Sequence, residues 1–129
     1  MTDSQATVYD AGLLVGADRN ERAIWAEHRV RLSAGIVPLV PANVVAQVSR
    51  SRRQVQLRRF LRGCEVARFD EGSAHRAGLL LAKSGTSDVV DASVVELAAT
   101  THGEILTTDL HDIECLVAAS GRRIRVSRR

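Results

Sequence analysis

The chain has 129 residues and a formal net charge of +3; 45% of its residues are hydrophobic and only 3% are aromatic. This length suits one domain with a core large enough to fold without disulfide or metal cross-links, so we expect a single domain over residues 1–129. No apolar run approaches the length of a membrane-spanning helix, and we therefore expect no membrane segment.

The location of the protein is indicated by its first residues and by its cysteines. The first ten residues carry neither a basic leader nor a long apolar core, so we expect no signal peptide. Cys64 and Cys115 are far apart and lack the paired spacing of zinc ligands, so we expect both to be buried, reduced thiols. These features predict a cytoplasmic protein.

Short β-prone runs alternate with helical runs along the chain. Strands are predicted over residues 6–10, 36–40, 64–68, 105–108 and 124–126. Helices are predicted over residues 11–17, 20–34, 41–48, 49–63, 70–83, 88–102 and 112–120. Because strands that alternate with helices form right-handed crossovers, the pattern predicts an α/β fold with a parallel sheet covered by helices on both faces.

Acidic residues gather at the junctions between these predicted elements. Asp10 ends the first strand and Asp109 follows the fourth, while Asp88 and Asp91, like Asp109 and Asp112, lie three residues apart near a helix start. Open α/β sheets bind ligands at the carboxyl ends of their strands, so we expect these acids to share one crevice. Taken singly, Asp88 and Asp112 are better explained as helix-capping or first-turn residues.

A shared crevice of carboxylates calls for a cation. Two carboxylates about 4 Å apart repel by roughly 4 kcal/mol at an effective dielectric of about 20. Oxygen ligands without Cys or His companions favour Mg²⁺ or Mn²⁺ over Zn²⁺, and such an ion polarises a phosphoryl oxygen and lowers the pKa of a bound water. The acids therefore predict hydrolysis of a phosphodiester, with Asp10, Asp91 and Asp109 favoured as the ligands.

Four segments together resemble the successive motifs of PIN-domain ribonucleases, and most of all those of VapC toxins of bacterial toxin–antitoxin pairs. They are residues 9–12 (Tyr-Asp-Ala-Gly), 41–47 (Pro-Ala-Asn-Val-Val-Ala-Gln), 88–92 (Asp-Val-Val-Asp-Ala) and 107–112 (Thr-Thr-Asp-Leu-His-Asp). Their order and spacing extend the resemblance over essentially the whole chain. It implies a three-layer α/β/α sandwich with a five-stranded parallel sheet of order 3-2-1-4-5. It further implies a Mg²⁺- or Mn²⁺-dependent endoribonuclease that forms a homodimer and has a cognate VapB antitoxin.

The resemblance also assigns roles to residues of this sequence. By motif position, Asp10, Asp91 and Asp109 are catalytic, metal-binding acids, Asp112 is a further contributor, and Thr107 is the hydroxyl residue that supports the site.

Two positions of the chain depart from the family pattern. Gln47 stands where a glutamate is usual, and Ala11 and Gly12 stand where a Ser, Thr or Asn often follows the first aspartate. Asp88 could compensate for the charge lost at Gln47. We therefore expect one metal ion to bind tightly and a second one weakly.

Residues 49–63 are predicted to be a helix with a strongly basic face. Arginine pairs bidentately with phosphates and carboxylates, so this face could contact RNA or an acidic antitoxin segment. A solvated surface explains it equally well. The candidate contacts are Arg50, Arg52, Arg53 and Arg59. The aromatic residues Tyr9, Trp25, Phe60 and Phe69 are expected in the core.

Other functions remain to be weighed against the ribonuclease. A phosphate-accepting receiver domain needs a late lysine, but the only lysine is Lys83, well before the last two strands. A haloacid-dehalogenase-type phosphatase needs a second aspartate two residues after the first, where Gly12 stands. The open alternative is a catalytically weak or inactive PIN domain that binds RNA or a partner, which Gln47 favours.

Overall fold

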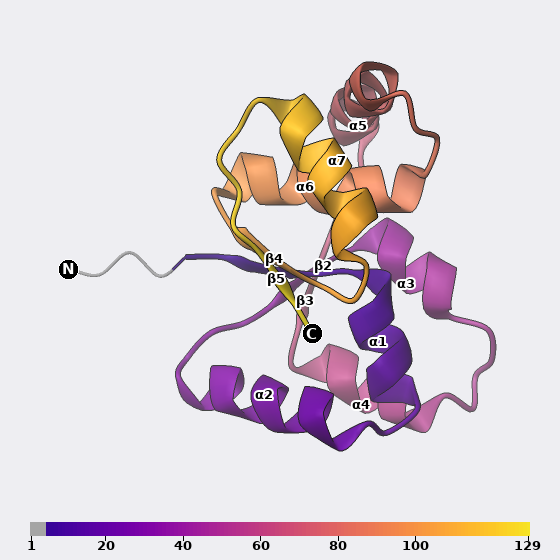
Figure 1. The fold of residues 1–129 in the computed structure, drawn as a ribbon. Helices are drawn as coiled ribbons and strands as arrows, with labels where there is room; N and C mark the ends of the chain where they lie inside the picture. The colour runs from indigo at the N-terminus through magenta and orange to yellow at the C-terminus, as the bar shows by residue number, and fades with distance from the viewer. Residues whose placement is uncertain (1–4) are drawn as a thin grey trace.

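Five short parallel strands form one sheet in the computed structural model of the chain, which describes residues 5–129 (Figure 1). Across the sheet they are β3 (Glu65–Ala67), β2 (Leu39–Pro41), β1 (Thr7–Tyr9), β4 (Glu104–Thr107) and β5 (Val126–Arg128). The order 3-2-1-4-5 is the predicted one. The leader prediction covers residues 1–10, of which 1–4 lie outside the described residues.

Helices cover both faces of the sheet, as the strand and helix alternation predicts. One layer holds α5 (Glu71–Ser84), α6 (Val89–Thr101) and α7 (Leu110–Ser120), and the other holds α1 (Ala11–Asp18), α2 (Arg22–Ser33) and α4 (Val55–Arg62) (Figure 1). A further helix, α3 (Ala42–Val48), follows β2 directly and contacts both α1 and α6. The predicted three-layer α/β/α class is thus confirmed. Within residues 5–129, no helix combines the length and hydropathy needed to cross a membrane.

The two central strands define the edge of the sheet at which the acids lie. Val8 pairs with Ile105 and Tyr9 with Leu106, and the backbone N–H of Asp10 continues the pairing by donating to Leu106 O at 3.1 Å. In these strands Val8, Tyr9, Ile105 and Leu106 are buried and apolar. Thr7 and Thr107 are buried and polar. Asp10 and Thr107 therefore end their strands side by side.

Two predicted strands are shifted in the structure. The second begins at Leu39 rather than residue 36, because Pro38 has no N–H and contributes only its carbonyl, which accepts from Glu65 N at 2.8 Å. Pro41 ends this strand instead of opening the next helix. The last strand runs over Val126–Arg128, not 124–126, because Ile105 N bonds to Arg125 O and the ladder starts there.

The predicted helix over residues 49–63 is wrong in its first part, because only Val55–Arg62 is helical. The Gln54 side chain holds the preceding loop: its Oε1 accepts from Arg50 N at 2.7 Å and Ser51 N at 2.9 Å. Its Nε2 donates to Asp18 Oδ2 at 3.1 Å and to Val48 O at 3.0 Å. An amide side chain that satisfies the backbone in this way stabilises a loop against continued helix.

The cysteines and the aromatic residues follow their predictions in part. Both thiols are free, but Cys115 is exposed, since α7 turns Ile113 and Leu116 inward instead. Cys64 is partly buried, and burial raises the pKa of its thiol to about 12. Tyr9 and Phe60 lie in the core, while Trp25 and Phe69 pack against it partly exposed.

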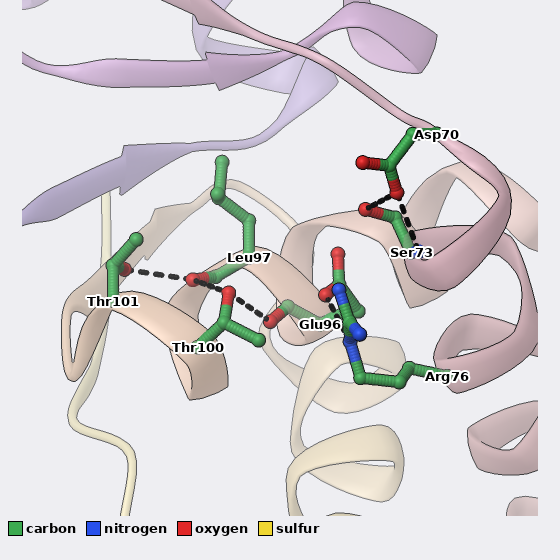
Figure 2. A network of polar contacts seen from close by, with 7 residues as sticks. All are labelled: Asp70, Ser73, Arg76, Glu96, Leu97, Thr100 and Thr101. Carbon is green, nitrogen blue, oxygen red and sulfur yellow. Dashed lines mark hydrogen bonds and ion pairs between the residues drawn. The ribbon is translucent and has the colours of Figure 1, made fainter.

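A polar network joins α5 to α6 (Figure 2). Asp70 caps α5 by accepting from the backbone N–H of Ser73 at 2.9 Å and from its hydroxyl at 3.0 Å. Arg76 Nε donates to Glu96 Oε2 at 2.9 Å, which neutralises a carboxylate that is only 5% exposed. This ion pair fixes α6, whose first turn carries Asp91, against α5.

Candidate functional site

Asp10 is the buried centre of the acidic edge. It is 4% exposed and is the N-cap of α1: its Oδ1 accepts from Gly12 N at 3.0 Å and Leu13 N at 3.4 Å. Its other oxygen accepts a hydrogen bond from the Thr107 hydroxyl. Burial raises the pKa of Asp10 above its ordinary value, although the hydrogen bond from Thr107 and those from the backbone N–H groups act in the opposite direction.

Gly12 lies against the side chain of Thr108. A Cβ added at Gly12 would come within 1.7 Å of Thr108 Oγ1 and 2.8 Å of its Cβ. A side chain at position 12 therefore has no room unless the β4–α7 loop moves. The space that the family pattern gives to a Ser, Thr or Asn after the first aspartate is occupied by Thr108 from another strand end.

Thr107 connects the two strand ends. It is fully buried, and its Oγ1 donates to Asp10 and accepts from the backbone N–H of Asp109 at 2.8 Å. That hydrogen bond fixes the backbone of Asp109, and the Asp109 side chain makes no capping hydrogen bond to the backbone of α7. The Asp109 carboxylate is thus left exposed at the edge of the sheet.

Asp88 and Asp91 belong to the start of α6. Asp88 is its N-cap and accepts from Asp91 N at 3.0 Å, as the capping interpretation predicts. Asp91 is partly buried, and its pKa is raised to about 7, first by burial and then by the charges of Asp88, Asp10, Asp112 and Asp109. The five acids from three separate segments are therefore close enough to repel one another, as the strand-end geometry predicts.

Asp112 lies in the first turn of α7, close to Asp109. A hydrogen bond with the Asp109 carboxyl and then the Asp109 charge raise the pKa of Asp112, with a smaller contribution from Asp88. In the absence of a cation, proton uptake is the way in which this edge reduces its negative charge.

Two hollows open at this edge. One of about 240 Å³ is lined by Thr86, Ser87, Asp88, Asp91, Asp112 and Leu116. The other, of about 380 Å³, is lined by Thr108, Asp109, Leu110, His111, Glu114 and Arg128. The donors are oxygens, which suit Mg²⁺ or Mn²⁺. Within residues 5–129, however, no three or more His, Cys, Asp or Glu side chains lie in positions that could hold a metal ion together.

The remaining predicted site residues lie outside these two hollows. Gln47 is exposed and lines a separate hollow of about 410 Å³ with Asn43 and Val90, among others. Arg50, Arg52 and Arg53 are exposed in the loop before α4, and Arg59 is exposed on that helix. The Arg50 guanidinium donates to Ser49 O at 2.8 Å and to Ala46 O at 3.1 Å.

Three residues of this edge are not among the candidates that the sequence suggests. Thr108 fills the space beside Gly12, and Glu114 and Arg128 line the larger hollow. Glu114 lies one helical turn after Leu110 in α7, so helical periodicity could have placed it near Asp109. Arg128 could not be found in this way, because its position depends on the register of β5.

The chain resembles several solved structures, whereas no protein-family model and no curated protein matches it. VapBC2 from Rickettsia felis bound to a promoter DNA fragment matches with a TM-score of 0.73 and 14% sequence identity, covering 97% of this chain and 99% of that one. DNA-bound VapBC from Salmonella typhimurium gives 0.72 and 16%, covering 97% and 98%. A toxin–antitoxin complex from Klebsiella pneumoniae gives 0.65 and 15%, covering 83% and 89%. Identities this low establish the fold alone: the chain has the fold of VapC-type PIN domains.

Proposed function

We propose that this protein is a metal-dependent endoribonuclease, the toxin of a type II toxin–antitoxin pair. The observation that carries the proposal is the crowding of Asp88, Asp10, Asp112 and Asp109 around Asp91, whose pKa is raised to about 7. Repulsion between carboxylates destabilises the folded state, and carboxyl groups with strongly shifted pKa values cluster at functional sites. The fold shared with VapBC complexes supports the choice of this reaction.

The acids have distinct parts in the proposed site. Asp10, Asp91 and Asp109 hold a Mg²⁺ or Mn²⁺ ion, and Asp112 and Asp88 add negative charge at its rim. Thr107 supports them by fixing the Asp10 carboxylate and the Asp109 backbone. The ion supplies Lewis-acid chemistry, polarising a phosphoryl oxygen and making a nearby water a better nucleophile.

Asp10→Asn tests the proposal with little risk to the fold. Asparagine caps a helix about as well as aspartate, so α1 keeps its N-cap while the carboxylate charge is lost. With purified protein, labelled RNA and Mn²⁺, we expect the wild type to cut and the variant to lose at least about 100-fold in rate. Glu65→Gln, at an exposed acid on β3, is the matched control and should cut normally. Equal cleavage by wild type and Asp10→Asn would mean a contaminating nuclease and would end the proposal.

A second candidate function is an RNA- or partner-binding module without cleavage. It is favoured by the amide at Gln47 and by the lack, within residues 5–129, of three acids arranged to hold an ion. RNA binding by a wild-type protein that cuts in neither Mg²⁺ nor Mn²⁺ would support it. Calorimetry with Mn²⁺ separates the two further, because the module needs no metal ion.

The proposed partners are RNA, a small VapB-like antitoxin and a second copy of the chain, all in the cytoplasm. The support for the antitoxin is that the similar structures are toxin–antitoxin complexes. Expression of the chain in bacteria should arrest growth, Asp10→Asn should not, and the product of a short reading frame directly upstream should restore growth. Light scattering of the purified chain tests the dimer.

A further inference from the structure

The larger hollow at the acidic edge contains a basic side chain beside the acids. Arg128, the last residue of β5, lines this space of about 380 Å³ together with Asp109, His111 and Glu114. Beyond Arg128 and His111 the charged residues lining it are acidic. A polyanionic substrate that approaches this edge therefore meets repulsion nearly everywhere, and Arg128 is the permanent positive charge within the hollow.

The backbone of Arg128 is held in register with the residue that organises the site. Arg128 is the pairing partner of Thr107 in the β4–β5 ladder, and the next residue, Arg129, donates its N–H to Thr107 O at 2.8 Å. Paired residues on adjacent strands point to the same face of a sheet. The backbone around Arg128 is thus held against that of Thr107 by main-chain pairing, and the Thr107 hydroxyl in turn contacts the Asp10 carboxylate and the Asp109 N–H.

The Arg128 guanidinium forms no ion pair within residues 5–129. Arg129, its neighbour, pairs with Glu27 at 3.0 Å, and Arg76 pairs with Glu96 at 2.9 Å. Asp109 and Glu114 line the same hollow as Arg128 and are not paired with it. The Arg128 side chain is exposed. Its backbone is fixed by the β4–β5 pairing, whereas its guanidinium is available to a ligand.

We propose that Arg128 is a substrate-binding residue, which holds a phosphate of the RNA strand next to the phosphate that is cut. This inference rests on the proposed nuclease function. A guanidinium binds a phosphate through two parallel hydrogen bonds, so it fixes both the position and the orientation of the strand. The arginines at positions 50, 52, 53 and 59 are candidate contacts for RNA or an antitoxin, and a solvated surface explains them equally well; they line neither of the acidic hollows, whereas Arg128 shares one with Asp109.

Three variants test this inference. Arg128→Gln removes the charge, Arg128→Lys keeps the charge but loses the two-pronged geometry, and Arg125→Gln is the matched control. Arg125 is an exposed arginine just before the same strand, and its charge change is identical. Circular dichroism and thermal unfolding establish that each variant is folded.

The expected result is a difference between Arg128→Gln and its control in substrate binding. We expect Arg128→Gln to raise KM for RNA about tenfold with a smaller change in kcat, and Arg128→Lys to fall between it and the wild type. In EDTA, where nothing is cut, the dependence of RNA affinity on salt should fall by about one unit of logarithmic slope. The same KM and salt slope for Arg128→Gln and Arg125→Gln would overturn the inference.

The binding measurement separates this inference from the nuclease proposal. If the wild type binds RNA and does not cut it, the nuclease proposal fails, and the salt slopes still decide whether Arg128 contacts phosphate. If the wild type cuts and the slopes of the two glutamine variants agree, only the role of Arg128 fails.

Discussion

Tyr9 and Asp10 are neighbours in the sequence but end in opposite environments. Successive residues of a strand point to opposite faces, and the Tyr9 hydroxyl contacts His28 Nδ1 at 2.9 Å and accepts from the Arg31 guanidinium at 3.1 Å. His28 also stacks on Phe60, with ring centroids 4.0 Å apart. Burial raises the pKa of Tyr9 to about 12, so the hydroxyl stays neutral with its partners in place.

The acidic edge differs from the surroundings of Tyr9 in the charges around its polar groups. Its polar groups are also partly buried, but the charges around Asp91 have the same sign, and burial together with those charges raises the pKa of Asp91 to about 7. In the aromatic region around Tyr9, His28 and Phe60, the polar groups find hydrogen-bond partners within the chain. The carboxylates of the acidic edge instead need a proton or a cation from solution to balance their charge. Buried polar groups whose partners lie within the chain stabilise the fold. Partly buried carboxylates whose charge is not balanced within the chain indicate a ligand.

The largest expected effect on activity separates activity from stability at the acidic edge. Asp91→Asn should lower RNA cleavage at least about 100-fold, which is about 3 kcal/mol in the barrier. Its metal-free form should unfold at the same temperature as the wild type or higher, because one like charge is removed. The measurements are cleavage in Mn²⁺ and thermal unfolding in EDTA. A variant that loses both activity and stability would place Asp91 among the structural residues instead.

Truncation in the aromatic region should have the opposite pattern. Phe60 is fully buried and contacts Tyr9, Trp25 and His28. Phe60→Ala should therefore reduce the free energy of unfolding by about 3–5 kcal/mol, measured by urea unfolding in EDTA. Phe60→Leu, which leaves a smaller cavity, is the control and should cost less. A loss below about 1 kcal/mol for the alanine variant would contradict the close packing of this region.

The Arg76–Glu96 pair offers an intermediate case, a buried acid with its own cation. Glu96 is 5% exposed, and the Arg76 side chain is 53% exposed. Arg76→Met strands the carboxylate and should cost about 2 kcal/mol, whereas Glu96→Gln leaves an exposed guanidinium in water and should cost about 1 kcal/mol. Urea unfolding of both variants tests this asymmetry. Equal losses would show that packing, and not the buried charge, controls the α5–α6 contact.

The alternation of strands and helices predicts the parallel sheet, and the placement of acids at strand ends predicts their grouping, because both patterns are local. The strand order 3-2-1-4-5 is implied only by the resemblance of the sequence motifs to those of PIN-domain ribonucleases. Alternating strands and helices require parallel pairing, and Asp10 and Asp109 follow their strands directly. The loop that replaces the start of the predicted helix over residues 49–63 could not be predicted, since it depends on the Gln54 side chain reaching Asp18. Arg128 was missed for a related reason: its pairing with Thr107 is set by the sheet register, not by the spacing along the chain.

The smallest expected effect is on the pH dependence of stability without metal. The folded pKa of Asp91 is raised from 3.8 to about 7, so between these values the folded state binds more protons than the unfolded chain. Stability therefore decreases as pH rises from about 4 to 7. Because the carboxyl is only partly buried, screening by solvent reduces the expected loss to about 1 kcal/mol.

Thermal unfolding at pH 5.5 and pH 8 in EDTA measures this loss directly. The wild type should unfold at a lower temperature at pH 8, and Asp91→Asn should show a smaller difference, with the remainder due to Asp10 and Asp112, whose pKa values are also raised. Millimolar Mn²⁺ at pH 8 should restore the stability of the wild type, since a bound cation replaces the protons as the partner of the acids. Restoration in Asp91→Asn to the same extent would show that the ion binds elsewhere, and the acidic edge would then be a cluster that only protons relieve.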